Sequence, residues 1–191
     1  TPTESAALGA VGSFLIAILQ KKINIKGLKE VSTESLKITS MVFFILIGAS
    51  IFSLVFRGFG GDRLVEDFLT SIPGGPIASL VLVMVTIFIM GFFLDFLEII
   101  FVIIPIVAPT LISMGFDPVW LGIVIAVNIQ TSFLTPPFGF ALFYFRGVAT
   151  SIIKTSEIYK GVFPFIILQI FLMIILFKFP LLVKWLPESI N

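Results

Sequence analysis

The sequence has 191 residues, of which 58% are hydrophobic and 12% are charged. A soluble domain is about half apolar and roughly a quarter charged, so this chain has too little polar surface to cover a globule in water. Its net charge of +1 provides no basic field for nucleic acid. The chain has no His and no Cys, which excludes disulfides, thiolate chemistry, haem and most zinc or iron sites.

Uncharged apolar stretches such as 38–56 and 77–94 are long enough to cross a hydrocarbon core of ~30 Å as helices. They lack the alternation of barrel strands, so the sequence predicts an all-α membrane protein. In chain order, residues 1–4 are typical of a helix start, and residues 6–19 form the first apolar stretch. Residues 20–37 are predicted to be a polar loop, which is cytoplasmic because lysines dominate its charge, and 38–56 then cross to the outside.

A polar, Gly-rich segment follows over residues 57–75. Within it, residues 62–70 are predicted to form a short interfacial helix, and the Pro-Gly-Gly-Pro cluster at 73–76 is a strong helix break. Two apolar arms come next, and they are separated by a pair of carboxylates rather than by a polar loop.

The two carboxylates, Asp95 and Glu98, allow two interpretations of these arms. Either two full spans meet at a cytoplasmic turn, or the arms form a re-entrant hairpin whose tip lies inside the membrane. We favour the hairpin, because no Lys or Arg lies between Arg63 and Arg146 to mark a cytoplasmic turn. A carboxylate at the bilayer centre costs ~2.5–3.5 kcal/mol and is a functional candidate, so Asp95 is the preferred site residue. An ordinary interfacial turn is the alternative.

The span predicted over residues 120–144 is interrupted in its middle. The Pro136-Pro137 pair removes two backbone donors and pushes the preceding residue out of helical geometry, so the helix is expected to unwind over 134–138. Residues 146–160 then mark a second cytoplasmic loop, 162–177 form the last span, and the C-terminus lies outside.

Broken helices at membrane depth occur only where they are buried in protein or line a wet cavity. The freed carbonyls and the C-terminal helix end can hold a cation such as Na⁺, which prefers hard oxygen ligands. Side chains of this type surround the break: Asn128, Gln130, Thr131, Ser132 and Thr135. A proline kink whose hydroxyls satisfy local backbone is the alternative, and we favour a site because so many polar residues flank the proline pair.

Four stretches that include these residues resemble, in the same order, the large membrane subunit of tripartite ATP-independent periplasmic (TRAP) transporters. They are 1–7 (TPTESAA), 47–50 (IGAS), 91–95 (GFFLD) and 128–139 (NIQTSFLTPPFG). Together they span the chain, and the last is the most specific. Because the family's large subunit is considerably longer, the resemblance implies that this chain is its C-terminal half and that an N-terminal half is missing.

The resemblance implies an elevator-type ion transporter fold with inverted repeats, of which this chain holds one repeat with a re-entrant hairpin and a broken helix. Scaffold-type helices and the Lys-rich loop would occupy 1–75. The transport-domain part would occupy 76–148, with the hairpin over 76–115 and the broken helix over 118–146. The C-terminal loop and the last transmembrane helix would occupy 149–191.

The resemblance also implies the function, which is Na⁺-coupled import of an organic acid in the inner (cell) membrane of a bacterium or archaeon. The partners would be a periplasmic substrate-binding protein and a small membrane subunit, and no cofactor besides the coupling ion is implied. The positions that match the family's Na⁺ and substrate site, acting largely through backbone carbonyls, are Gly91, Asp95, Asn128, Thr131, Ser132, Thr135, Pro136 and Gly139.

Two other functions compete with transport. A channel subunit could use the polar broken helix to line a water-filled path. An intramembrane aspartyl protease would need a second Asp facing Asp95, and the other aspartates, Asp62, Asp67 and Asp117, lie in predicted loops. We therefore expect a transporter and not an enzyme.

Overall fold

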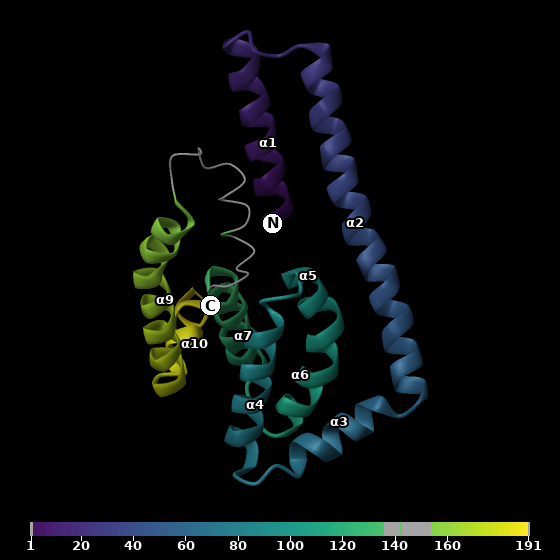
Figure 1. The fold of residues 1–191 in the computed structure, drawn as a ribbon, viewed down its shortest axis with the longest axis vertical. Coiled ribbons are helices and arrows are strands. Elements are labelled where there is room, and N and C mark those ends of the chain that lie inside the picture. The colour runs from purple at the N-terminus through teal and green to yellow at the C-terminus, as the bar shows by residue number, and fades with distance from the viewer. Residues whose placement is uncertain (1, 136–141, 143–153, 191) are drawn as a thin grey trace. The chain divides into compact units, whose positions relative to one another are not determined.

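The computed structural model describes residues 2–135, 142 and 154–190, and this part of the chain is built from helices (Figure 1). Segments long and apolar enough to cross a membrane are Ile25–Gly58, Phe96–Ser113 and Thr155–Lys178, counted over the described residues. The predicted all-α membrane class is therefore confirmed. The elements are α1 (Pro2–Leu19), α2 (Ile25–Gly58), α3 (Gly61–Thr70), α4 (Gly75–Met90), α5 (Phe96–Glu98), the π-helical turn η1 (Ile99–Ile103), α6 (Ile104–Ser113), α7 (Pro118–Leu134), α9 (Thr155–Lys178) and α10 (Leu181–Ile190).

The chain divides into two compact units, Thr1–Phe44 and Ile45–Asn191, and α2 contributes to both. The first unit holds α1 and the beginning of α2, and its large apolar side chains are mostly exposed. The second unit holds the end of α2 and the elements from α3 onward, including both predicted interruptions.

The predicted polar loop over residues 20–37 is wrong for most of its length, because α2 begins at Ile25. The side chain of Asn24 accepts a hydrogen bond from the Gly27 N–H at 2.6 Å and so caps the helix start. Lys37 pairs with Glu34 at 2.6 Å one turn apart, which is a weak surface stabilisation. Lysines that the sequence places in a loop therefore lie on a helix that continues beyond the apolar span.

The second Lys-rich segment, 146–160, is also partly helical. Helix α9 begins at Thr155, and the Glu157 carboxylate accepts the Lys154 N–H at 3.1 Å, which stabilises this start. Residues 146–153 lie outside the described part of the chain. The short helix predicted over 62–70 is confirmed by α3, and the break predicted at 73–76 by the left-handed Gly74 (φ 108°) before α4.

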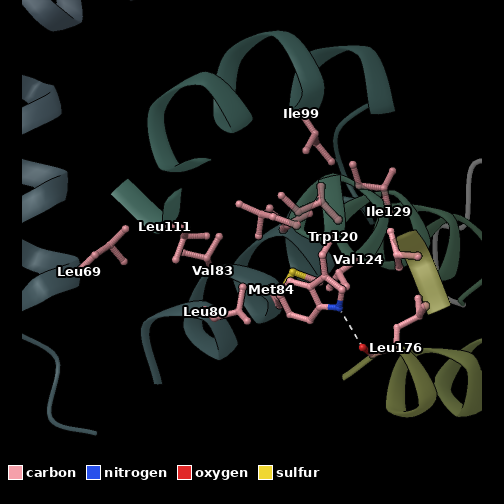
Figure 2. Packing of buried hydrophobic residues seen from close by; sticks show 14 residues of the cluster. Leu69, Leu80, Val83, Met84, Ile99, Leu111, Trp120, Val124, Ile129 and Leu176 are labelled. Carbon is pink, nitrogen blue, oxygen red and sulfur yellow. Dashed lines mark hydrogen bonds between the residues drawn. The ribbon is translucent and has the colours of Figure 1, made fainter. Parts of the chain in front are cut away.

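The core of the second unit lies around α4, which packs against both α6 and α7 (Figure 2). Lipid is as apolar as these side chains, so close packing and interhelical hydrogen bonds hold the helices together more than hydrophobic burial does. The Ser79 hydroxyl donates to the Leu69 carbonyl at 2.6 Å, and the Trp120 indole N–H donates to the Leu176 carbonyl at 2.9 Å. The fully buried side chains of this core include Leu80, Ile87, Ile99, Leu111, Leu121 and Val124.

Trp120→Phe is expected to lower the stability of the complete transporter by ~0.6–1.7 kcal/mol, the usual value of an interhelical hydrogen bond in a membrane. The phenyl ring keeps the aromatic contact with Phe177, whose ring centroid lies 5.3 Å from that of Trp120, and loses the donor to Leu176. Trp120→Ala removes the ring as well and is expected to cost about 3–5 kcal/mol. Thermal unfolding of both variants checks this, and an unchanged melting temperature for Trp120→Phe would contradict it.

Candidate ion-binding site

The predicted turn between the two apolar arms is present. Helix α4 ends at Met90, and residues 91–94 form a turn in which the N–H groups of Phe93 and Leu94 both donate to the Met90 carbonyl. Asp95 is extended (φ −69°, ψ 153°) and starts the return arm of α5, η1 and α6, which packs against α4. The two arms therefore form a helical hairpin with its tip at 91–95.

Gly91 brings this hairpin tip against the end of α7. A Cβ built on Gly91 would lie 2.8 Å from the Ser132 Cβ and would collide with the Ser132 hydroxyl oxygen. The backbone of Gly91 is ordinary (φ −64°, ψ −8°), so glycine is required here for space and not for conformation. Two of the expected site residues, which are far apart in the sequence, are thus in direct contact.

The start of the unwinding predicted over 134–138 is present, and residues 136–138 lie outside the described part of the chain. Helix α7 ends at Leu134, and Thr135 is extended (φ −89°, ψ 125°), as expected for a residue that precedes a proline. Two of the expected site positions, Pro136 and Gly139, lie outside the described residues. The end of α7 therefore points its carbonyls, which carry the negative end of the helix dipole, toward the break.

Three hydroxyls line this last part of α7, and each donates its hydrogen back into the helix. Thr131 donates to the Val127 carbonyl at 2.7 Å, Ser132 to Ile129 at 2.7 Å and Thr135 to Thr131 at 2.8 Å. A hydroxyl that donates in this way presents its oxygen lone pairs outward, which is the form that ligates a hard cation. The same bonds also fit the alternative of hydroxyls that satisfy local backbone.

Asn128 holds α7 to the first arm of the hairpin. Its side-chain amide is buried and donates to the Met84 carbonyl of α4 at 2.8 Å. At the tip, the rings of Phe96 and Phe133 meet edge to face with centroids 5.8 Å apart. Sequence reasoning placed Asn128 among the ion ligands, and the structure gives its amide nitrogen a role in joining α4 to α7.

The carboxylate of Asp95 is half-buried and caps the return arm, where it accepts the Phe96 N–H at 2.6 Å. A capping role was not anticipated, although Asp directly before a new helix is a recognised start signal. The π-helical turn η1, which follows Glu98, was also missed. Such turns are frequent at functional sites, and no sequence pattern used above identifies one.

Comparisons with known proteins match nearly the whole chain, including both of these segments, to one family. The chain matches, over residues 1–182, the family model described as the DctM component of tripartite ATP-independent periplasmic transporters. It is 25% identical, over 98% of its length, to the sialic acid TRAP transporter large permease protein SiaM of Vibrio cholerae. It is 29% identical, again over 98% of its length, to the C4-dicarboxylate TRAP transporter large permease protein DctM of the same organism.

The chain covers 44% of that SiaM and 46% of that DctM, so it spans less than half the length of these relatives. It is also 30% identical, over 92% of its length, to the isethionate TRAP transporter permease protein DctMQ of Oleidesulfovibrio alaskensis, of which it covers 27%. The resemblance seen in the four sequence stretches is confirmed by the family match across nearly the whole chain. The chain therefore belongs to the DctM family of tripartite ATP-independent periplasmic transporters.

Proposed function

We propose that this chain is the part of a TRAP large permease that forms one Na⁺ site between the hairpin tip and the broken helix, and that the complete transporter uses this site to import an organic acid. The main observation that supports this proposal is the contact between Gly91 and Ser132, which places the tip against the last turn of α7. The oxygens supplied there are the hydroxyls of Thr131, Ser132 and Thr135 and the carbonyls at the helix end. Pro136 and Gly139 would shape the loop beyond.

The linkage between ion and hairpin follows from this geometry. The tip either contacts the end of α7 or lies away from it. A cation with ligands on both segments binds the contacting state more tightly, and this difference in affinity shifts the equilibrium toward contact. Asp95 adds negative charge beside the tip and so favours a bound cation. Na⁺ would thus order the tip before the substrate anion binds.

The length of the first arm supports a re-entrant hairpin, whereas the return arm, Phe96–Ser113, is by itself long and apolar enough to cross a membrane. Helix α4 has 16 residues and extends about 24 Å, which is shorter than a hydrocarbon core of ~30 Å. In this proposal, residues 76–148 belong to a moving transport domain of an elevator-type transporter, and 1–75 belong to the scaffold. The Lys-rich segments would then be cytoplasmic and the C-terminus periplasmic.

The substrate class and the partners are proposed from the relatives. The matched relatives are named for sialic acid, C4-dicarboxylates and isethionate, which are all organic acids. DctMQ is longer than the others relative to this chain, which fits a small membrane subunit fused to the large one. We expect a small subunit, a periplasmic binding protein and the N-terminal half of the permease to complete the transporter in the bacterial inner membrane. The family is one of transporter permeases, so the enzyme alternative is excluded.

Uptake by the complete transporter in proteoliposomes tests this proposal. Uptake of a C4-dicarboxylate or sialic acid should require an inward Na⁺ gradient and the cognate binding protein, and should stop when Na⁺ is replaced by choline. Uptake that is independent of both Na⁺ and the binding protein would overturn the proposal. Single-channel currents across a planar bilayer would instead support the channel alternative, because a carrier produces none.

A further inference from the structure

A pocket lies at the other end of the hairpin from the tip, where α4 and α7 begin and where α6 and α9 end. Its volume is about 350 Å³, and α10 contributes one side by packing against α7. None of the positions expected for the ion site belongs to it. The residues that line it are Ile77, Leu80, Gly115, Phe116, Asp117, Trp120, Phe177, Pro180, Leu181 and Lys184.

The lining of this pocket is apolar apart from one ion pair. Lys184 Nζ lies 2.7 Å from Asp117 Oδ2, and both side chains are about one-third exposed (37% and 36%). The hydrogen bond from Lys184, and next the Trp120 N–H, hold the pKa of Asp117 below its ordinary value. The Asp117 carboxylate, which lies just before α7, is therefore charged at neutral pH, and its partner Lys184 lies on the short helix α10.

We propose that this pocket binds a phospholipid whose headgroup carries a primary ammonium, as in phosphatidylethanolamine. Part of an acyl chain lies along the apolar wall formed by Ile77, Trp120 and Leu181, while the phosphate lies against Lys184 and the ammonium against Asp117. Such a headgroup extends the ion pair into four alternating charges. The occupant is a lipid because the pocket lies beside membrane-length helices, near the exposed Trp185, a residue type enriched at membrane interfaces.

Headgroup chemistry makes the proposal specific. A trimethylated ammonium, as in phosphatidylcholine, has no N–H to donate to Asp117. Phosphatidylglycerol has a phosphate for Lys184 but no cation for Asp117. A lipid that only fills the apolar wall would not distinguish among the three headgroups, so their order of affinity reports the ion pair directly.

Native mass spectrometry of the delipidated complete transporter, titrated with these three lipids on matched acyl chains, tests the proposal. We expect phosphatidylethanolamine to bind at least about tenfold more tightly than the other two lipids. Lys184→Met should weaken this binding at least about tenfold, and Lys184→Arg should keep it. Lys178→Met is the matched control, because Lys178 is exposed at the end of α9 and does not line the pocket.

Asp117→Asn separates charge from helix capping, because Asn and Asp cap helices about equally well. This variant should lose the preference for phosphatidylethanolamine over phosphatidylcholine while the transporter keeps its melting temperature. Equal binding of the three lipids, no lipid binding at all, or unchanged affinity in Lys184→Met would overturn the proposal. Phosphoethanolamine, the headgroup alone, is expected to bind far more weakly, and equal affinity would assign the pocket to a soluble phosphate instead. None of these outcomes depends on Na⁺ coupling.

Discussion

Gly91→Ala is expected to reduce Na⁺-driven uptake by the complete transporter at least about tenfold. The new methyl group would collide with the Ser132 hydroxyl and lie 2.8 Å from the Ser132 Cβ, so the hairpin tip must move away from α7. Overpacking of this kind costs about 1–3 kcal/mol, and the loss falls on the state in which the tip is closed. The measurement is the initial uptake rate as a function of Na⁺ concentration in proteoliposomes.

Two further variants make this result interpretable. Gly122→Ala, on α7, is the matched control, because a Cβ at Gly122 meets nothing within 4 Å and uptake should be unchanged. Gly91→Ala should also lower the melting temperature, and combining it with Ser132→Gly removes the obstructing atoms and should recover part of that loss. If Ser132 also ligates Na⁺, the double variant will recover stability but not ion affinity. Normal Na⁺-dependent uptake in Gly91→Ala alone would show that the tip does not need to close on α7.

Asp95→Asn should weaken Na⁺ dependence with little change in stability. Asn retains the helix-capping acceptor for the Phe96 N–H and removes the negative charge beside the tip. We expect the Na⁺ concentration for half-maximal uptake to rise about tenfold, equivalent to about 1.4 kcal/mol. Asp95→Ala removes the cap too and should additionally lower stability by about 1 kcal/mol.

Asp67→Asn is the control for this charge change. Asp67 is an exposed carboxylate on α3, far from the hairpin tip in the sequence. It should leave both the Na⁺ dependence and the melting temperature unchanged. If Asp95→Asn also has an unchanged Na⁺ dependence, Asp95 is a capping residue and has no part in the ion site.

The interruptions were predictable because local chemistry dictates them. Pro136 disfavours a helical conformation of Thr135, and Gly74 and Gly75 supply the positive φ at the start of α4. The position of the hairpin turn followed from the carboxylates that interrupt an apolar run. These features depend on neighbours in sequence, so no tertiary information was needed to place them.

The errors and omissions have physical reasons of two kinds. Charged residues are as compatible with a helix extending into water as with a loop, so the start of α2 at Ile25 and of α9 at Thr155 could not be inferred from charge. Contacts such as Trp120 with Leu176 and Asp117 with Lys184 join segments that are distant in sequence. A single sequence contains no signal that pairs such residues.

The hydrogen bond from Asn128 to the Met84 carbonyl has a mechanical consequence. If α4 separated from α7, a buried amide would face hydrocarbon, where an unsatisfied polar group costs several kcal/mol. We therefore expect α4 and α7 to move together and the hairpin to bend mainly in its return arm. There η1 already departs from α-helical winding, and Pro105 and Pro109 lack the N–H that a regular helix would use. In the proposed function, release of Na⁺ would therefore move the return arm while the first arm stays with α7.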